Sequence, residues 1–141
     1  MRLSPATVLD GLDGNSFQVG VMRVLIVEDE PIVSLDIEST LRSAGYQVIG
    51  TAGSVSRALK LLGNSQCDLV VLDMNLGGES AEPVAEALQQ RGITYICLTG
   101  YATYRLPAGS QNVPVLLKPF EPDKLLAMID TALPLRKAHL S

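Results

Sequence analysis

The sequence LVVLDMNLGG spans residues 69–78 and combines an apolar run with turn-forming residues. Four apolar residues lead into Asp73, and Asn75 and a pair of glycines follow. A continuous apolar run of this length, bounded by turn residues, is typical of a strand buried on both faces of a sheet. Asp73 is therefore expected where such a strand ends and a flexible loop begins.

Four more apolar runs of similar length lie on either side of this one. They are RVLIV (23–27), QVIGTA (47–52), YICLT (95–99) and VPVLLK (113–118). Most of their residues are β-branched or large and aliphatic, as in strands. Together with residues 69–73 they predict five strands.

Segments with helical periodicity separate these strands. Ser54 is placed to cap one helix, Gly45 and Gly63 are expected to end the first two, and Pro122 opens the last. Another helix is expected near Ala81, with Pro83 in its first turn and its end at Gly92, while the last helix closes at Pro134. The predicted inward faces are Val33, Ile37, Leu41 and Ala44; Val55, Ala58, Leu59 and Leu62; Val84 and Leu88; and Leu125, Met128, Ile129 and Ala132.

This alternation predicts an α/β fold, a doubly wound five-stranded parallel sheet with helices on both faces. The interval GYATYRLPAGSQN (100–112) is the exception, because it holds a proline and two glycines and shows no amphipathic repeat. We expect a short or irregular fourth helix there.

The length of 141 residues suits one domain, which we expect over residues 22–134. Residues 1–21 show no sustained period and are expected to form a flexible extension, and residues 135–141 form a tail. The net charge of −4 and the scattered lysines and arginines argue against binding to nucleic acid. No apolar segment approaches the ~20 residues that span a membrane, and the two cysteines lie in or beside apolar stretches, so a reduced, cytoplasmic protein is expected.

Polar residues stand at the carboxyl ends of four predicted strands. Glu28 and Asp29 follow the first, Asp73 ends the third, Thr99 ends the fourth, and Lys118 ends the fifth. Ligands of open α/β sheets bind outside these strand ends. We therefore expect the five side chains to converge on one rim.

Three carboxylates in one place would repel one another and raise their pKa values unless a cation balances them. Carboxylate oxygens, together with a backbone carbonyl just after Asp73 and several waters, suit Mg²⁺. With Lys118, such a site matches phosphoryl transfer to the Asp73 carboxylate, and Thr99 could donate a hydrogen bond to the product.

These motifs resemble the receiver domain of bacterial two-component response regulators, of the single-domain type. The resemblance is carried by VLIVEDE (24–30), DLVVLDMNL (68–76), LTG (98–100) and LLKPFEPDKLL (116–126), and it covers about residues 22–133. It implies a flavodoxin-like receiver fold with strand order 2-1-3-4-5.

The resemblance also implies a role for each site residue. Asp73 would be the phosphoacceptor, and Lys118 would contact the phosphoryl group. Thr99 would be the switch hydroxyl. Glu28, Asp29, Asp73 and the backbone carbonyl of Asn75 would hold Mg²⁺. A cis peptide bond between Lys118 and Pro119 is implied as well.

The chain departs from the family pattern at the switch. Many receivers carry Tyr or Phe three residues before the lysine, where this chain has Val115. Tyr101, two residues after Thr99, resembles the Thr-Gly-Tyr arrangement of a subgroup of stand-alone receivers and could supply the aromatic switch. The interval from Thr99 to Lys118 is also shorter than is usual in the family.

Several alternatives stay open. Glu28, Asp29 and Glu30 could form a solvated turn, with Asp29 capping a helix that begins at Pro31, and Asp73 could be a turn former before the glycines. A degenerate receiver would bind a partner without phosphorylation. A phosphatase with an aspartyl nucleophile would usually need a second aspartate where this chain has Asn75.

The favoured function is a stand-alone receiver that switches partner binding or relays phosphate, not an enzyme that turns over free substrates. Its expected partners are a histidine kinase or histidine phosphotransfer protein and a downstream protein, with a possible phosphorylation-dependent dimer. Neither nucleic acid nor a membrane is an expected partner.

Overall fold

The computed structural model describes residues 7–10, 18–100 and 112–133. Five parallel strands form its main sheet, in the spatial order β4-β3-β5-β8-β9. They are β3 (Arg23–Val27), β4 (Gln47–Ala52), β5 (Leu69–Asp73), β8 (Thr94–Thr99) and β9 (Val115–Leu117). Numbered along the chain, this is the order 2-1-3-4-5, so the predicted doubly wound fold is confirmed.

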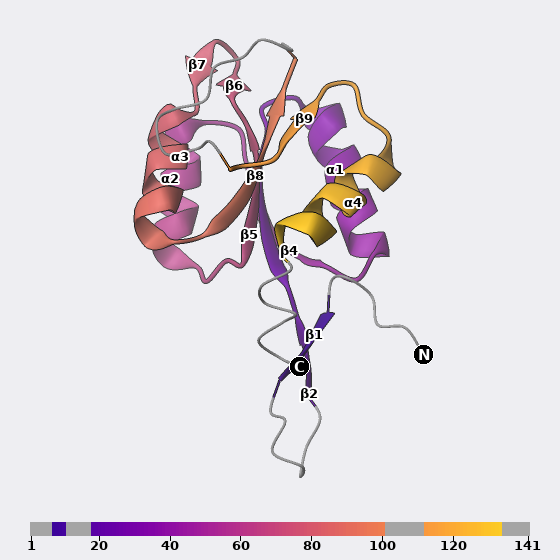
Figure 1. The fold of residues 1–141 in the computed structure, drawn as a ribbon. Helices are drawn as coiled ribbons and strands as arrows, with labels where there is room; N and C mark the ends of the chain where they lie inside the picture. Colours follow the sequence, from indigo (N-terminus) through magenta and orange to yellow (C-terminus); the bar gives the residue numbers. More distant parts are fainter. Residues whose placement is uncertain (1–6, 11–17, 101–111, 134–141) are drawn as a thin grey trace.

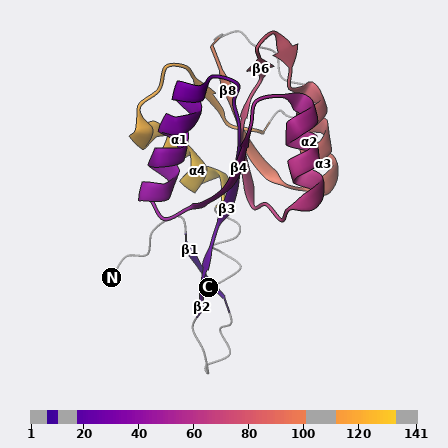
Figure 2. The same cartoon turned by 180° about the vertical axis from the view of Figure 1, so that it is seen from behind.

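Helices cover both faces of the sheet, as Figures 1 and 2 show. Helices α1 (Pro31–Ser43) and α4 (Pro122–Ala132) lie on one face, and α2 (Val55–Asn64) and α3 (Glu82–Arg91) lie on the other. None of these helices, within the described part of the chain, is long and apolar enough to cross a membrane.

Two hydrophobic clusters fill the space between the helices and the sheet. Alternate residues of one strand enter opposite clusters: Val24 and Ile26 pack towards α1 and α4, and Leu25 and Val27 towards α2 and α3. Every residue of β5 is buried, as its uninterrupted apolar sequence predicts. This burial fixes the end of β5, and with it the position of Asp73.

Most predicted helix boundaries agree with the structure. Ser54 caps α2, because its hydroxyl accepts a hydrogen bond from the Arg57 N–H at 3.2 Å. Gly92 ends α3 in the left-handed conformation, and Gly45 follows α1 with a positive φ. The last helix extends over Pro122–Ala132, with Leu125 and Ile129 buried.

Two expectations for α2 are wrong. Gly63 does not end the helix, which continues through it to Asn64 because Gly63 keeps an ordinary negative φ. Leu59 is exposed, since the buried face is centred on Ala58 and Leu62 and leaves Leu59 at its margin. Leu61, on the opposite margin, packs against the core in its place.

Three further differences concern strands. The last strand is shorter than predicted, and Val115 and Leu117 on it are exposed while Leu116 is buried. Two short hairpins were not predicted, β1 (Thr7–Asp10) with β2 (Gln18–Val21) and β6 (Asn75–Leu76) with β7 (Glu79–Ser80).

The flexible extension over residues 1–21 stays a prediction. The irregular helix expected between residues 100 and 112 falls on residues 101–111, which lie outside the described residues.

Candidate functional site

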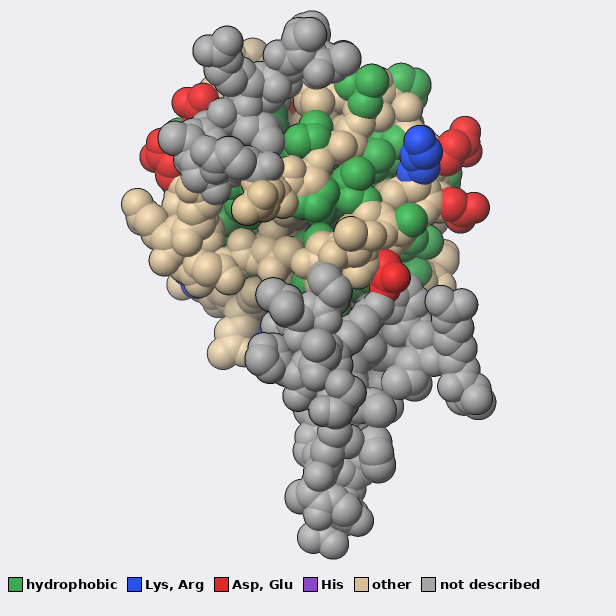
Figure 3. Space-filling view, viewed as in Figure 1, with side chains coloured by type: hydrophobic (Ala, Val, Ile, Leu, Met, Phe, Trp, Pro, Cys, Tyr) green, Lys and Arg blue, Asp and Glu red, His purple; other side chains and the backbone are tan. Residues whose placement is uncertain are grey.

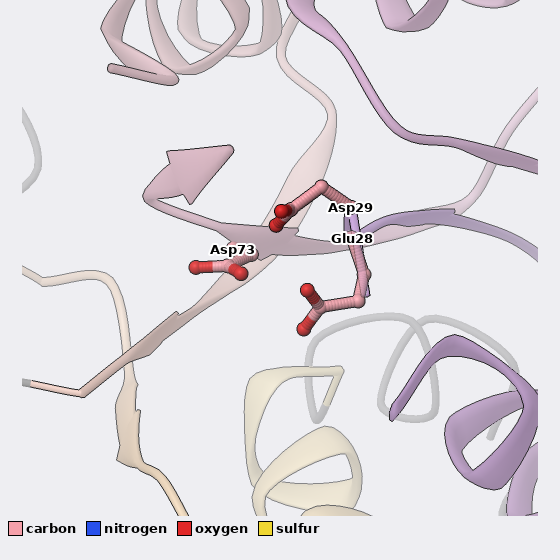
Figure 4. A group of neighbouring side chains, drawn as sticks. All are labelled: Glu28, Asp29 and Asp73. Atoms are coloured by element: carbon pink, nitrogen blue, oxygen red, sulfur yellow. The ribbon is translucent and has the colours of Figure 1, made fainter. Parts of the chain in front are cut away.

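Three carboxylates meet at the carboxyl ends of two neighbouring strands. Glu28 and Asp29 directly follow β3, and Asp73 is the last residue of β5. Because Val27 and Leu72 are paired in this parallel ladder, the residues after them lie side by side. One oxygen of each carboxylate lies within 4.8 Å of one from each of the others (Figure 4). The structure thus brings these three predicted residues together.

Lys118 reaches the same cluster from the end of β9, the edge strand of the sheet. Its Nζ lies 2.6 Å from Glu28 Oε1 and 2.9 Å from Asp73 Oδ2. It follows β9, and its backbone N–H donates to the Thr99 carbonyl at 2.8 Å. The Lys118–Pro119 peptide bond is cis, as the resemblance implies. The ammonium group therefore neutralises part of the acid cluster directly.

The pKa values of both partners in this ion pair are raised, for different reasons. The pKa of Glu28 rises to about 7, because desolvation and the neighbouring Asp73 outweigh the hydrogen bond from Lys118. Burial alone would lower the pKa of Lys118, but its hydrogen bonds to Glu28 and Asp73 outweigh that effect and raise it to about 12. Lys118 stays charged at neutral pH, whereas Glu28 is poised to bind or release a proton there.

The donor atoms at this site fit Mg²⁺. The cluster offers carboxylate oxygens only, from Glu28, Asp29 and Asp73, and a hard cation prefers such ligands. One lysine cannot balance three acids, so a divalent cation would remove the remaining repulsion. Burial and the neighbouring Asp73 carboxylate raise the pKa of Glu28, and a bound cation would favour its ionised form instead.

Asn75 lies beside the cluster at the start of β6. Its backbone N–H donates to Asp73 Oδ1 at 3.1 Å, and its side-chain Oδ1 accepts from the Gly78 N–H at 2.7 Å. The side chain thus supports the turn of the hairpin and leaves the backbone carbonyl as the group that could reach a metal.

Of the predicted switch residues, Thr99 and Val115 lie at different distances from the acid cluster. Thr99 is buried at the end of β8, between the strand of Asp73 and the strand that leads to Lys118. Val115 lies on β9 and is 41% exposed. Tyr101 lies outside the described residues. The structure therefore places Thr99 at the site and Val115 away from it.

The alternative in which Asp29 caps α1 does not agree with the structure. The N-cap residue is Glu30, and no side-chain hydrogen bond caps this helix. Asp29 instead turns its carboxylate towards Asp73 (Figure 4).

Sequence reasoning did not predict the contacts of two acids near the site. Glu30 lies 3.6 Å from Lys118 Nζ through Oε1, and Glu79 Oε1 accepts a hydrogen bond from the Val55 N–H at 3.3 Å. The Gly77-Gly78 pair could have indicated the hairpin that carries Glu79, since two glycines between short strands are typical of a tight hairpin, but it does not indicate the bond to Val55.

Comparison with known proteins points to response regulators. The family model of the response regulator receiver domain matches residues 24–130. The chain is 32% identical over 116 residues to the phyllosphere-induced regulator PhyR of Methylorubrum extorquens, covering 79% of this chain and 43% of that one. It is 29% identical over 114 residues to the transcriptional regulatory protein PdtaR of Mycobacterium tuberculosis, covering 78% of this chain and 56% of PdtaR.

Solved structures resemble the fold over most of its length. The solution structure of SdrG from Sphingomonas melonis Fr1 superposes with a TM-score of 0.66 at 38% identity, covering 77% of this chain and 95% of SdrG. A CheY-like receiver protein from Methanospirillum hungatei gives a TM-score of 0.75 at 25% identity, covering 85% and 99% of the two chains. The chain spans about half the length of the curated relatives PhyR and PdtaR.

Proposed function

The chain belongs to the response regulator receiver domain family, and on that premise we propose that it accepts a phosphoryl group on Asp73 in a Mg²⁺-dependent reaction. The donor is a histidine kinase or a histidine phosphotransfer protein. The observation that carries the proposal is the position of Lys118 Nζ, 2.9 Å from Asp73 Oδ2, inside a group of three convergent carboxylates.

The reaction transfers one phosphoryl group. An Asp73 carboxylate oxygen attacks phosphorus, the bond between phosphorus and the donor histidine nitrogen breaks, and that nitrogen keeps the bonding electron pair. With a small acyl phosphate as donor, the phosphorus–oxygen bond breaks instead and a carboxylate leaves. Burial of Asp73 on a fixed strand end holds the nucleophile in place for this attack.

The remaining residues neutralise and orient the transferred group. Lys118 would exchange its contact with the Asp73 carboxylate for one with a phosphoryl oxygen, and Thr99 would donate a hydrogen bond to another. Bound Mg²⁺, held by Glu28, Asp29, Asp73 and the Asn75 carbonyl, would supply charge neutralisation on the phosphoryl oxygens.

The product is a signalling state and not a catalytic intermediate. Asn75 occupies the position of the second aspartate of an aspartyl phosphatase, so no second carboxylate is available there as a general acid. Slow attack of water on phosphorus would release inorganic phosphate and reset the protein. The output is altered binding of a downstream protein, or relay of the phosphoryl group, in the cytoplasm, and phosphorylation could also promote a dimer.

Phosphorylation of Asp73 is testable with a small acyl phosphate and Mg²⁺. The expected result is a mass increase of one phosphoryl group on the intact protein, which disappears in Asp73→Asn because the amide cannot act as the nucleophile. Asp36→Asn, a matched change on the exposed surface of α1, should still be labelled. Full labelling of Asp73→Asn would refute the assignment.

A degenerate receiver that binds its partner without phosphorylation is the second candidate. It is favoured by Val115, an exposed aliphatic residue where many receivers have an aromatic switch. The two functions differ in how partner binding responds to the phosphate mimic beryllofluoride. A switch changes its affinity with the mimic, and a constitutive module does not.

A further inference from the structure

The β6–β7 hairpin connects the acid cluster to the start of α2. It begins two residues after Asp73 and lies at the same end of the sheet as the site, on the side of α2 and α3 (Figure 1). A Cβ atom at Gly77 would lie 3.4 Å from Asp29 Oδ2, so the turn of the hairpin passes directly beside that carboxylate. The outgoing strand then carries Glu79 to the Val55 N–H.

The pairing within the hairpin determines where the Asn75 carbonyl points. The Ala81 N–H donates to the Met74 carbonyl at 3.1 Å, so these two residues form a hydrogen-bonded pair. The next pair, Asn75 with Ser80, is then of the non-hydrogen-bonded kind, because the two kinds alternate in an antiparallel ladder. The N–H and C=O of Asn75 therefore face away from Ser80. Its N–H already bonds to Asp73, which places its carbonyl on the same edge.

Two side chains hold the hairpin against the domain. Leu76 is buried in the cluster formed with α2 and α3, and Glu79 is its direct partner in the ladder. Side chains of directly opposite residues project from the same face of a hairpin. Leu76 and Glu79 thus fix the same face at two points, one by apolar packing and one by a hydrogen bond.

The hydrogen bond of Glu79 is favoured by its position. Val55 is the first residue of α2, and its N–H has no partner within the helix. A carboxylate at a helix N-terminus also interacts favourably with the helix dipole. Ser54 caps the Arg57 N–H, so Glu79 satisfies a different donor of the same helix end.

We propose that Glu79 is a positioning residue of the metal centre, which holds the β6–β7 hairpin in the orientation that directs the backbone carbonyl of Asn75 towards the cation. This inference rests on the proposed function, since it concerns the same Mg²⁺ site. Glu79 itself bonds to Val55 and acts on the cation only through the hairpin. Its effect is therefore on Mg²⁺ affinity and not on the chemistry of Asp73.

Calorimetric titration with Mg²⁺ of the metal-free protein tests this role. Glu79→Ala should raise the Mg²⁺ dissociation constant roughly three- to tenfold, the range expected for loss of one supporting hydrogen bond. Glu79→Gln keeps an acceptor oxygen and should recover part of the loss. Glu86→Ala, which removes the same charge from an exposed position on α3, should bind Mg²⁺ like the wild type.

Two further readouts separate positioning from a general loss of structure. In metal-free Glu79→Ala the Val55 amide should exchange with solvent faster than in the wild type. The midpoint of thermal unfolding of Glu79→Ala should equal that of Glu86→Ala. At saturating Mg²⁺ the rate of phosphorylation by a small acyl phosphate should stay within twofold of the wild type.

Equal Mg²⁺ affinities in Glu79→Ala and Glu86→Ala would overturn the inference. The proposed function is judged separately, by Asp73→Asn in the same experiments. If Asp73→Asn loses labelling while Glu79→Ala binds Mg²⁺ normally, the phosphoacceptor site stands and the role of Glu79 falls. If Asp73→Asn is still labelled, the proposed function itself falls.

Discussion

Glu28 is a buried carboxylate in direct contact with a lysine. It is 3% exposed, it contacts Lys118 at 2.6 Å, and its second oxygen accepts from the Glu30 N–H at 3.1 Å. These contacts favour its charged form, yet burial and the nearby Asp73 raise its pKa to about 7. In the metal-free protein, the site therefore disfavours the charge that metal binding requires.

This conflict predicts a pH-dependent stability for the metal-free protein. The pKa of Glu28 is raised in the folded state above its ordinary value of 4.5, so its contribution is fully present below that value and is lost as pH rises through about 7. Because one pKa unit corresponds to about 1.4 kcal/mol, the loss between pH 5 and 8 amounts to at most about 3 kcal/mol. Urea unfolding in the presence of EDTA, at pH values from 5 to 8, measures it.

Glu28→Gln is the control for this effect. The amide does not titrate, so the free energy of unfolding of this variant should change less between pH 5 and 8 than that of the wild type. Mg²⁺ should also flatten the wild-type profile, since a bound cation favours the ionised carboxylate. Identical pH profiles for the two metal-free proteins would contradict the shift.

The helices and strands were largely predictable from the sequence, as was the convergence of the polar strand ends. Three of the five strands, β3, β4 and β5, match the predicted bounds, because continuous apolar runs and turn residues delimit them. The position of Asp73 follows directly from the burial of β5. Lys118 comes near it because β8 separates their strands by one position only.

The bond of Glu79 and the exposure of Leu59 could not be predicted, because they depend on contacts between distant segments. Glu79 approaches the site only through its bond to Val55, which no local pattern reveals. The exposure of Leu59 depends on how α2 rotates against the sheet, and its spacing alone fits an inward position equally well. The short hairpin at Gly77 and Gly78 was passed over because its strands have two residues each.

Two glycines in neighbouring elements should respond oppositely to substitution by alanine. Gly63 lies inside α2 with open space around its Cβ position, so Gly63→Ala should stabilise the protein by roughly 0.5–1 kcal/mol. Gly77 has φ +63° and would place a Cβ atom beside the Asp29 carboxylate, so Gly77→Ala should destabilise it by about 1 kcal/mol. Chemical unfolding of the two variants in parallel measures both changes.

Mg²⁺ affinity distinguishes these variants further. Gly77→Ala should weaken Mg²⁺ binding because it disturbs the hairpin beside Asp29, whereas Gly63→Ala, remote from the acids, should bind like the wild type. A stabilised Gly77→Ala protein would show that the turn carries no backbone strain and that the hairpin tolerates a side chain next to the site.

The site joins the sheet to both helical layers of the domain. The acids follow β3 and β5 in the middle of the sheet, Lys118 leads from β9 towards α4, and Glu79 ties the hairpin to α2. Unfolding either layer would disperse these groups. The native state alone can therefore bind the cation at this site, and binding should stabilise the entire domain.

Addition of Mg²⁺ should consequently raise the midpoint of thermal unfolding. At a Mg²⁺ concentration about 100 times the dissociation constant, binding contributes about 2.7 kcal/mol, which corresponds to an increase on the order of 10 °C for a domain of this size.

Asp29→Asn should lose most of this increase because it removes a ligand carboxylate. Glu30→Gln, which removes a neighbouring charge outside the ligand set, should retain it. Sodium chloride at equal ionic strength separates site binding from general screening, since monovalent salt should give a much smaller increase. Equal increases in the wild type and Asp29→Asn would show that the cation binds elsewhere on this acidic protein. If Mg²⁺ binds at the converging strand ends, the stabilisation of the whole domain depends on the Asp29 carboxylate.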